Sequence, residues 1–410
     1  MHEEIEKALS KLSKAPLTSD EFEKYCAKRK LILSCPVIQV AGSIGKSCLV
    51  HYLESIYLAA GYRVGAFFSS SLDGLQGMVR FGGENIPSKD LLELFHKNEK
   101  DLNRFGLTYF QASVALAYRY FEEKKPDLVI VETGLGGALD PTNLETLDTR
   151  LSIIASVSMD NTAELGTTLS QIALHAAGII KPQAPVLVGN IDTTTLDTIR
   201  EEALKQKSTL YRVEAFHFEH LVEGKFHFDY GPYKDVVLGT DASYQVINAS
   251  LAIEATRLLQ NDFPVTEEAV RAGLGKPNLP VRFERFGRVM LDAAHNPESA
   301  EALARCARTI GQGKPVHVLF ASLREKNIAV ELPTLANAVY TITLTTFDHP
   351  LARDGIDFMI YADDHPFEED AWAALGKLLA EHPEDAILVT GSFEFVGMVR
   401  QRIETEGLPA

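Results

Sequence analysis

Short apolar runs alternate with amphipathic segments along most of the chain. Each run is four to seven residues long and is rich in Val, Ile, Leu and Ala, which is typical of a buried strand. The runs in the first part of the chain lie at 36–41, 63–68, 127–132, 151–157 and 184–188.

The segments between these runs have the spacing of helices. Thr18-Ser-Asp-Glu21 has the sequence of a capping box, which predicts a short helix to about Lys30. Helical periodicity also covers the segment from the end of the first strand to Gly61, and the ranges 111–123, 169–178 and 245–259. Strands that alternate with helices over short links predict a parallel sheet covered by helices.

Two segments break this alternation. Residues 209–238 are short, Tyr/Phe/His-rich stretches with turns, and they predict a small antiparallel insert. Asn278–Val281 has the composition of a linker. After it the alternation restarts, with predicted strands at 289–292, 316–320, 340–345 and 386–390.

Length and composition limit the classes of protein. A chain of 410 residues exceeds what one hydrophobic core usually organises, so we expect two domains, 1–280 and 281–410. The net charge of −16 argues against a general nucleic-acid or anionic-membrane surface. No apolar run is long enough to span a membrane, and the four cysteines form no CxxC pair, so we expect a cytoplasmic protein with reduced thiols. The twelve histidines show no HExxH or similar metal spacing.

The first strand leads directly into Gly42-Ser-Ile-Gly45-Lys46-Ser47. Glycines let backbone amides turn toward an anion, and the following helix offers its positive N-terminus. A lysine here reaches the outer phosphates and a hydroxyl can bind Mg²⁺. The spacing is shorter than in GxxxxGK[ST], but the strand–loop–helix context indicates nucleotide binding. The alternative is a tight turn with a solvated lysine.

Glu132 ends an otherwise apolar strand. The carboxyl edge of a parallel sheet is where open α/β proteins bind ligands. A carboxylate at that edge can hold Mg²⁺, which prefers oxygen ligands. Taken alone, Glu132 could equally be an exposed strand end. Beside a phosphate loop, we interpret it as a magnesium ligand.

Several motifs together resemble the folylpolyglutamate synthase/dihydrofolate synthase family of the Mur ligase superfamily, across nearly the whole chain. The motifs occur in the family's order, which is more specific than the phosphate loop alone. Each resembles a family segment (VAGTNGK, EVGLGGRLDATN, TSIGLDHTEFLG, AGIIKP, HQxxNA, LDGAHNP and VTGS). In this chain the corresponding residues are 40–46, 132–143, 156–166, 177–182, 244–249, 291–297 and 389–392.

The resemblance implies a fold and a reaction. The expected fold is α/β: a P-loop parallel sheet domain with helices on both faces, at 1–280, and a smaller Rossmann-like glutamate-ligase domain, at 281–410. ATP would phosphorylate a folate-type carboxylate, and glutamate would attack the acyl phosphate to give an amide, ADP and phosphate. The expected partners are these small molecules, with no nucleic acid or membrane, and the expected state is a monomer.

The same resemblance implies roles for individual residues. Lys46 and His295 would be catalytic, and Ser47, Ser69 and Glu132 would hold Mg²⁺. His295 could instead be a capped loop histidine and Asp292 a turn-forming aspartate. The nucleotide contacts carried over are Gly42, Gly45, Lys46, Ser47, Asn248, Arg282, Asp292 and His295.

The chain departs from the family where chemistry is expected. Asn161 replaces a histidine ligand of the family's second magnesium, and Ala176 replaces its carbamylated lysine. Ala138 replaces the arginine of GLGGRLD, Ile44 replaces the loop asparagine, and 70–71 replace a Pro-His pair that reaches toward folate. Alanine cannot carry a carbamate, so we expect the second metal site to be weak or absent. His175, beside Ala176, could place a positive charge there or be an ordinary helix-surface histidine.

Two functions are the main competitors, and another P-loop activity, such as a phosphotransfer that does not end in an amide, is a further alternative. The first is an ATP-dependent amide ligase that adds glutamate to a folate-type carboxylate. The second is a non-catalytic ATP-binding homologue with a regulatory or partner-binding role. The sequence leaves open the acyl acceptor, the number of glutamates added, dihydrofolate synthase activity and the oligomeric state.

Overall fold

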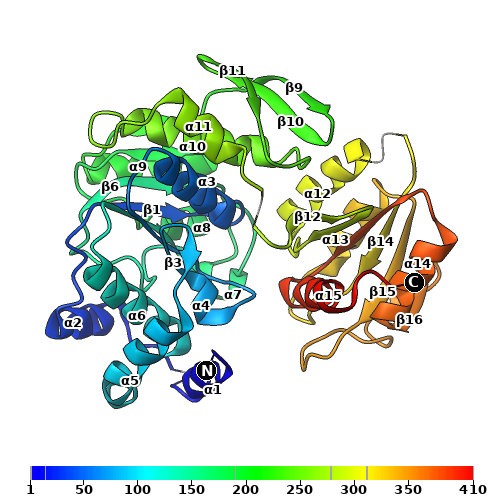
Figure 1. The fold of residues 1–410 in the computed structure, drawn as a ribbon, viewed down its shortest axis with the longest axis horizontal. Helices are drawn as coiled ribbons and strands as arrows, with labels where there is room; N and C mark the ends of the chain where they lie inside the picture. Colours follow the sequence, from blue (N-terminus) through cyan, green and yellow to red (C-terminus); the bar gives the residue numbers. More distant parts are fainter. Residues whose placement is uncertain (1, 14, 190, 278, 311–312, 410) are drawn as a thin grey trace. The chain divides into compact units, whose positions relative to one another are not determined.

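The computed structural model describes residues 1–410 except 1, 14, 190, 278, 311–312 and 410; for residues 2, 3 and 218 only the backbone is described. Asn278, in the expected linker, therefore lies outside the described residues. The chain divides into two compact units. The first contains residues 1–220, 227–238 and 246–276, and the second contains 221–226, 239–245 and 277–410. Each unit is an α/β structure, as the sequence predicts (Figure 1).

The first unit is built on an eight-stranded sheet in the order β4-β3-β2-β5-β1-β6-β7-β8. Six neighbouring strands of this sheet, β2, β5, β1, β6, β7 and β8, pair in parallel. The hairpin of β3 and β4 pairs antiparallel with the free edge of β2. The strands are β1 (Val37–Ala41), β2 (Val64–Phe67), β3 (Val79–Phe81), β4 (Glu84–Asn85), β5 (Leu128–Glu132), β6 (Thr149–Ile154), β7 (Val186–Val188) and β8 (Leu210–Arg212).

Helices flank this sheet, and several begin at side-chain caps. Thr18 and Glu21 form the expected capping box at the start of α2, with Thr18 N donating to Glu21 Oε2 at 3.0 Å. The helices are α1 (His2–Leu9), α2 (Ser19–Arg29), α3 (Lys46–Ala59), α4 (Gly74–Met78), α5 (Ser88–Phe105), α6 (Tyr109–Lys124), α7 (Thr162–Leu165), α8 (Leu169–Ala177), α9 (Thr193–Lys205), α10 (Gln245–Leu258) and α11 (Glu267–Leu274).

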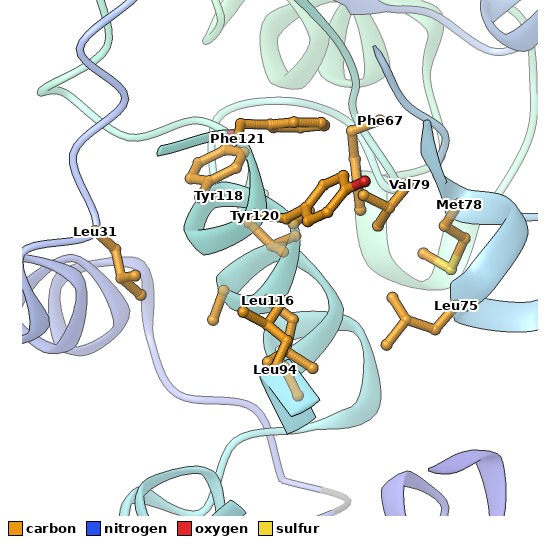
Figure 2. Close-up of a cluster of buried hydrophobic side chains, with 14 of the residues drawn as sticks. Leu31, Phe67, Leu75, Met78, Val79, Leu94, Leu116, Tyr118, Tyr120 and Phe121 are labelled. Atoms are coloured by element: carbon orange, nitrogen blue, oxygen red, sulfur yellow. The ribbon is translucent and has the colours of Figure 1, made fainter. Parts of the chain in front are cut away.

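Two hydrophobic clusters hold these helices to the strands. In the first, Tyr118 and Phe121 of α6 pack with Phe67 of β2 and residues of α4 and α5 (Figure 2). In the second, Ile172 of α8 and Ile199 of α9 pack with residues of β6 and β7. The strand β5 is apolar up to its last residue, Glu132, whose side chain is buried at the end of the strand.

The segment 209–238 is only partly the insert that the sequence predicts. Strands β9 (His217–Val222), β10 (Lys225–Tyr230) and β11 (Tyr233–Val237) form a three-stranded sheet in which β10 and β11 are antiparallel. The first strand of the segment, β8, instead pairs in parallel with β7 and extends the main sheet. The prediction was wrong for these three residues because a strand of this length carries too little pattern to show its partner.

The second unit contains a six-stranded sheet in the order β12-β13-β17-β14-β15-β16, in which only β12 is antiparallel. No helix in the described part of the chain is long and apolar enough to cross a membrane. The elements are β12 (Arg282–Phe286), β13 (Val289–Asp292), α12 (Pro297–Ile310), β14 (Val316–Phe320), α13 (Ile328–Ala336), β15 (Thr341–Thr346), the 3₁₀ helix η1 (Met359–Tyr361), β16 (Phe367–Asp370), α14 (Ala371–Glu381), β17 (Ala386–Thr390) and α15 (Phe393–Glu406).

Candidate active site

The loop from β1 to α3 can be built only with its two glycines. Gly42 has a φ of 136°, and a Cβ on it would lie 2.9 Å from both the N and the O of Ser156. Gly45 has a φ of 85°, and a Cβ on it would lie 2.4 Å from Oδ1 of Asn248. Gly42 therefore leaves no room for a side chain against the backbone of Ser156, and a side chain at Gly45 would be strained by the positive φ and would displace Asn248. The second contact also brings Asn248, from α10, against the loop.

Ser156 fixes the conformation of this loop. Its carbonyl accepts from the amide of Ser43 at 3.1 Å, and its hydroxyl accepts from the amide of Ile44 at 2.9 Å. The next amides of the loop belong to the first turn of α3, whose N-cap is Gly45. Amides of a first helical turn have no intrahelical acceptor, and a glycine N-cap supplies no side chain. The start of α3 is therefore suited to an anion such as a phosphate.

Lys46 lies over the loop that it follows. Its Nζ donates to the carbonyl of Gly42 at 2.7 Å and to the carbonyl of Ser43 at 3.3 Å. These acceptors are neutral, so the positive charge of the lysine stays uncompensated by them. A phosphate bound at the start of α3 would meet that charge directly.

Glu132 gathers the three expected metal ligands into one cluster. Its Oε1 accepts from the hydroxyl of Ser47 and from the hydroxyl of Ser69, each at 2.9 Å. Its Oε2 is buried and has no hydrogen-bond partner among the described residues. A carboxylate and two hydroxyls are the hard oxygen donors that Mg²⁺ prefers. The donor set and the orphaned oxygen therefore fit a magnesium ion.

Asn161 and Ala176 meet at one small cavity beside the phosphate loop. The cavity has a volume of about 20 Å³, and Lys46 and Asp160 also line it. Ala176 is buried, and its methyl group supplies no polar atom to the cavity. The two departures from the family motifs, Asn161 and Ala176, therefore affect the same small cavity, which Lys46 also lines.

His175 and Ala138 belong to a neighbouring contact. The carbonyl of His175 accepts from the amide of Ala138 at 2.8 Å, and the imidazole stem packs near Gly136. Ala138 itself is exposed. The described residues that line the small cavity include Ala176 but not His175, because adjacent helical residues point about 100° apart. The structure thus favours the ordinary helix-surface histidine.

The remaining expected nucleotide contacts lie in the second unit. Asp292 ends β13 and is buried; its Oδ2 accepts from the hydroxyl of Tyr244 at 2.6 Å and its Oδ1 accepts from the amide of Ala294 at 3.0 Å. Burial raises the pKa of Asp292, and the hydrogen bond from Tyr244 and the charge of Arg282 oppose that shift. The carboxylate is thereby oriented and has a defined set of donors.

His295 follows Asp292 in the loop before α12. Its Nδ1 lies 2.7 Å from the carbonyl of Ala293, which can only accept, so Nδ1 carries the proton. This bond fixes the tautomer and the orientation of the ring. The backbone of His295 donates to the hydroxyl of Ser299 at 3.1 Å. His295 is thus a loop histidine with a fixed ring rather than a mobile one.

Arg282 opens β12 between two strained residues. Val281 and Phe283 have φ values of 53° and 57°, and the register of β12 against β13 shifts between Arg282 and Glu284. Positive φ is a genuine outlier for β-branched and aromatic residues. Such strain persists only where the surroundings impose it, and it often marks a functional position. The guanidinium of Arg282 lies 5.7 Å from the ring centroid of Phe393.

Two residues of the site were missed from the sequence. Ser156 shapes the phosphate loop across 112 positions of sequence, and only its place at the start of a family-like segment hinted at a role. Tyr244 occupies the histidine position of the HQxxNA-like motif, and its hydroxyl holds Asp292. Both act on other site residues rather than on a ligand, which is why no motif singled them out.

Comparison with known proteins gives a consistent answer. Residues 281–393 match the family model described as "Mur ligase, glutamate ligase domain". The chain is 30% identical over 400 residues to the dihydrofolate synthase/folylpolyglutamate synthase of Bacillus subtilis (strain 168), covering 89% of this chain and 90% of that protein. This chain belongs to the dihydrofolate synthase/folylpolyglutamate synthase family. Its Escherichia coli (strain K12) relative is 29% identical, covering 90% and 86% of the two chains.

Solved structures agree with this family membership. Escherichia coli FolC in complex with ADP superposes with a TM-score of 0.87 at 27% identity, covering 98% of this chain and 97% of that one. A bifunctional folylpolyglutamate synthase/dihydrofolate synthase with Mn, AMPPNP and L-glutamate bound superposes with a TM-score of 0.84 at 26% identity, covering 97% and 96%. The predicted α/β fold class is thereby confirmed.

Proposed function

We propose that this member of the family is an ATP-dependent amide ligase that joins glutamate to a folate-type carboxylate. A carboxylate oxygen attacks the γ-phosphorus of ATP and ADP leaves. The glutamate amine then attacks the acyl carbon, the C–O bond to phosphate breaks, and the amine loses a proton. Each turnover yields one amide, one ADP and one phosphate. The relatives named above carry the names of such ligases.

One observation carries this proposal: the carboxylate of Glu132 accepts from both Ser47 and Ser69 beside the amides of the phosphate loop. A helix N-terminus, a lysine and a cluster of oxygen ligands suited to Mg²⁺ lie together in the first unit, although they come from distant parts of the sequence. Phosphoryl transfer needs positioning and charge neutralisation more than any covalent help from the protein. These are the groups that supply both.

In this proposal, the residues of the phosphate loop and their neighbours have separate roles in binding ATP. The first amides of α3, with Gly45 as N-cap, hold the outer phosphates, and Lys46 neutralises charge on the group being transferred. Mg²⁺ held by Ser47, Ser69 and Glu132 would add a further positive charge at the phosphates. Gly42 keeps the loop close to Ser156, so the amides stay aimed at the anion.

The second unit supplies the other contacts in this proposal. We infer that Arg282, Asp292 and His295 bind the nucleotide, together with Asn248 of the first unit. Residues 1–280 would then form the ATP-binding domain and residues 281–410 the glutamate-ligase domain. The match of 281–393 to the glutamate ligase domain supports the second assignment.

We further infer that this chain works with one magnesium ion where the family motifs imply two. Ala176 supplies no ligand to the cavity beside Lys46, and Asn161 supplies at most a neutral oxygen. Lys46 lines this cavity and brings a positively charged ammonium group to it. The chemistry would therefore depend on Lys46 more heavily than in relatives that retain the second site.

Those same two residues motivate a second candidate, a non-catalytic ATP-binding homologue. Its basis is the loss of second-metal ligands alone. The intact cluster at Glu132 and the names of the relatives favour the ligase. We also propose that the protein acts as a cytoplasmic monomer; its four cysteines are buried and form no disulfide with one another, which suits a reducing compartment.

A labelled-glutamate assay separates the two candidates. The pure protein is incubated with ATP, Mg²⁺, radiolabelled glutamate and a panel of folates and other carboxylates. The ligase proposal expects labelled amide product and phosphate in equal amounts, both lost in Lys46→Ala and kept in the surface control Lys205→Ala. Intact ATP binding without product across the panel would support the non-catalytic homologue instead.

A further inference from the structure

The N-terminal helix α1 reaches the loop that carries Ser69. Oε1 of Glu6 accepts a hydrogen bond from the amide of Leu75 at 2.8 Å, and its Oε2 accepts from the hydroxyl of Tyr109 at 2.9 Å. Leu75 belongs to the first turn of α4 and Tyr109 to the first turn of α6. One carboxylate therefore joins three helices that are distant in the sequence. Glu6 lies outside every motif quoted above.

Glu6 supplies the cap that α4 lacks. Amides of a first helical turn have no acceptor inside their own helix. Asp73 is the N-cap residue of α4, but its side chain makes no capping hydrogen bond. The carboxylate of Glu6 takes that place from another helix, and a Cβ on Gly74 would lie only 2.4 Å from its Oε1. Because the acceptor is a carboxylate, this hydrogen bond is stronger than one between neutral groups.

The loop between β2 and α4 is thereby held at both ends. At its base, the amide of Phe68 donates to the carbonyl of Met78 at 2.8 Å. At its far end, Glu6 holds the first turn of α4. Ser69 lies between these two anchors, and its hydroxyl donates to Glu132 at 2.9 Å. The place of Ser69 beside the end of β5 therefore depends on how firmly the loop is anchored.

The second partner of Glu6 belongs to a helix that packs on the ends of both strands. A Cβ on Gly134, two residues after Glu132, would lie 2.5 Å from Cζ of Phe110, so this ring of α6 lies against the backbone that follows β5. The same ring lies 6.1 Å, between centroids, from that of Phe67, which ends β2. The start of α6 thus has a fixed place beside β2 and β5, and Glu6 ties the loop to it.

The geometry that Mg²⁺ requires makes this anchoring relevant to function. The hydroxyl oxygens of Ser47 and Ser69 each lie 2.9 Å from Oε1 of Glu132. Neighbouring ligands of an octahedral Mg²⁺ with bonds of about 2.0–2.1 Å lie about 2.9 Å apart. Mg²⁺ tolerates little departure from this geometry, so a shift of Ser69 by roughly 1 Å would remove it from the ion.

We propose that Glu6 is a positioning residue of the magnesium site. It fixes the loop of Ser69 against the start of α6, so that Ser69 stays within reach of an ion held by Glu132. The inference rests on the proposed function only through this shared site, and it adds α1 to the parts of the fold that the site needs. A purely structural Glu6 would stabilise the first unit without changing what Mg²⁺ contributes to nucleotide binding.

Calorimetry with the ATP analogue AMPPNP separates these two roles without measuring catalysis. The affinity is measured at a fixed free Mg²⁺ concentration and again in EDTA, and the ratio of the two is the gain that Mg²⁺ provides. We expect Glu6→Ala to lose roughly 10-fold of this gain, the lower end of the loss that follows removal of a metal ligand's supporting group. The affinity in EDTA should stay unchanged, because the phosphate loop does not involve Glu6.

Two milder variants grade the effect. In Glu6→Gln the amide oxygen can still accept from Leu75 and the amide NH₂ can donate to Tyr109, so most of the gain should be kept. Tyr109→Phe removes one of the two hydrogen bonds of Glu6 and keeps the ring, so its gain should lie between those of wild type and Glu6→Ala.

Three further variants act as controls. Glu4→Ala changes an exposed glutamate of the same helix and should leave the gain unchanged. Ile199→Val removes a buried methyl group from α9 and should lower Tm without loss of the gain. Ser69→Ala leaves the other two oxygen ligands in place. In that background Glu6→Ala should cause no further loss, because Glu6 acts through Ser69.

Three results would overturn the proposal: a full Mg²⁺ gain in Glu6→Ala, an equal further loss when Glu6→Ala is added to Ser69→Ala, or the same loss in Ile199→Val at a matched fall in Tm. The ligase assay is scored separately. If wild type forms no amide but Glu6→Ala still loses the gain, the ligase proposal fails and the role of Glu6 stands. A wild type in which Mg²⁺ adds nothing to AMPPNP affinity would contradict both.

Discussion

The two oxygens of Glu132 have unequal surroundings. One accepts from Ser47 and Ser69, and the other is buried with no partner among the described residues. A buried polar atom without a hydrogen bond costs about 1–3 kcal/mol. Stability alone would favour a neutral group here. Binding of a cation to Glu132 explains why the protein retains a carboxylate here despite its cost in stability.

Replacing Glu132 by Gln should therefore separate function from stability. The amide keeps one oxygen for Ser47 and Ser69 but removes the negative charge that holds Mg²⁺. We expect the ligase rate to fall by about 100-fold or more, whereas Tm stays level or rises. Phosphate release and calorimetry measure the two effects, with Glu201→Gln on the surface of α9 as control. An unchanged rate would remove Glu132 from the metal site.

Asn161 and Ala176 allow the opposite experiment, a gain of function. Asn161→His combined with Ala176→Lys places an imidazole and a carbamate-forming amine at the cavity beside Lys46. We expect the double variant to bind a second Mg²⁺ and to raise the ligase rate, and each single variant to do less, since the two groups act on one ion. Equal rates in wild type and a well-folded double variant would refute our account of the lost site.

Helix α3 carries the phosphate-loop residues at its start and a buried carboxylate in its second half. Glu54 is 1% exposed and lies 3.3 Å from Arg80 of β3. Burial raises the pKa of Glu54 from 4.5 to about 7, and the charge of Arg80 opposes that shift. The folded protein thus holds a proton that the unfolded chain has lost over this interval.

The pH dependence of stability follows from that difference. Below pH 4.5 the carboxyl is protonated in both states, and between 4.5 and about 7 only the folded state keeps the proton. Raising the pH through this window should therefore lower the free energy of unfolding, by up to about 3 kcal/mol at roughly 1.4 kcal/mol per pH unit. Glu54→Gln should flatten urea-denaturation stability over the same window. A variant as pH-dependent as wild type would contradict this assignment.

The elements predicted well from the sequence are those whose pattern is unambiguous. β1, β5 and β14 are mostly apolar runs with one polar residue each, and each is a buried parallel strand. The strands β3 and β4 were not predicted, because strands as short as Glu84–Asn85 contain too few residues to show a period. The start of α6 was placed two residues late, since its capping box at Thr108 went unnoticed.

Site residues could be predicted from local sequence only where they lie close together in one motif. Lys46 and Ser47 are adjacent in sequence, so the phosphate loop was evident. The bonds from Ser69 to Glu132 and from Tyr244 to Asp292 join residues 63 and 48 positions apart. The family resemblance supplied the first pair, and neither local pattern nor resemblance supplied the second.

At the scale of the whole molecule, the residues that the family resemblance assigns to the site belong to two compact units. The phosphate loop and the metal cluster belong to the first, and Arg282, Asp292 and His295 belong to the second. The net charge of −16 keeps polyanions away in general, so binding of ATP must rest on local groups such as Lys46 and the amides of α3.

The most direct test of the ligase proposal follows one oxygen atom. A folate-type substrate labelled with ¹⁸O in its carboxylate is incubated with ATP, Mg²⁺ and glutamate, and the released phosphate is analysed by mass spectrometry. An acyl phosphate transfers one carboxylate oxygen to phosphate, so we predict one ¹⁸O in phosphate for each amide formed, with none in Lys46→Ala. Unlabelled phosphate without amide would show simple ATP hydrolysis and contradict the proposal.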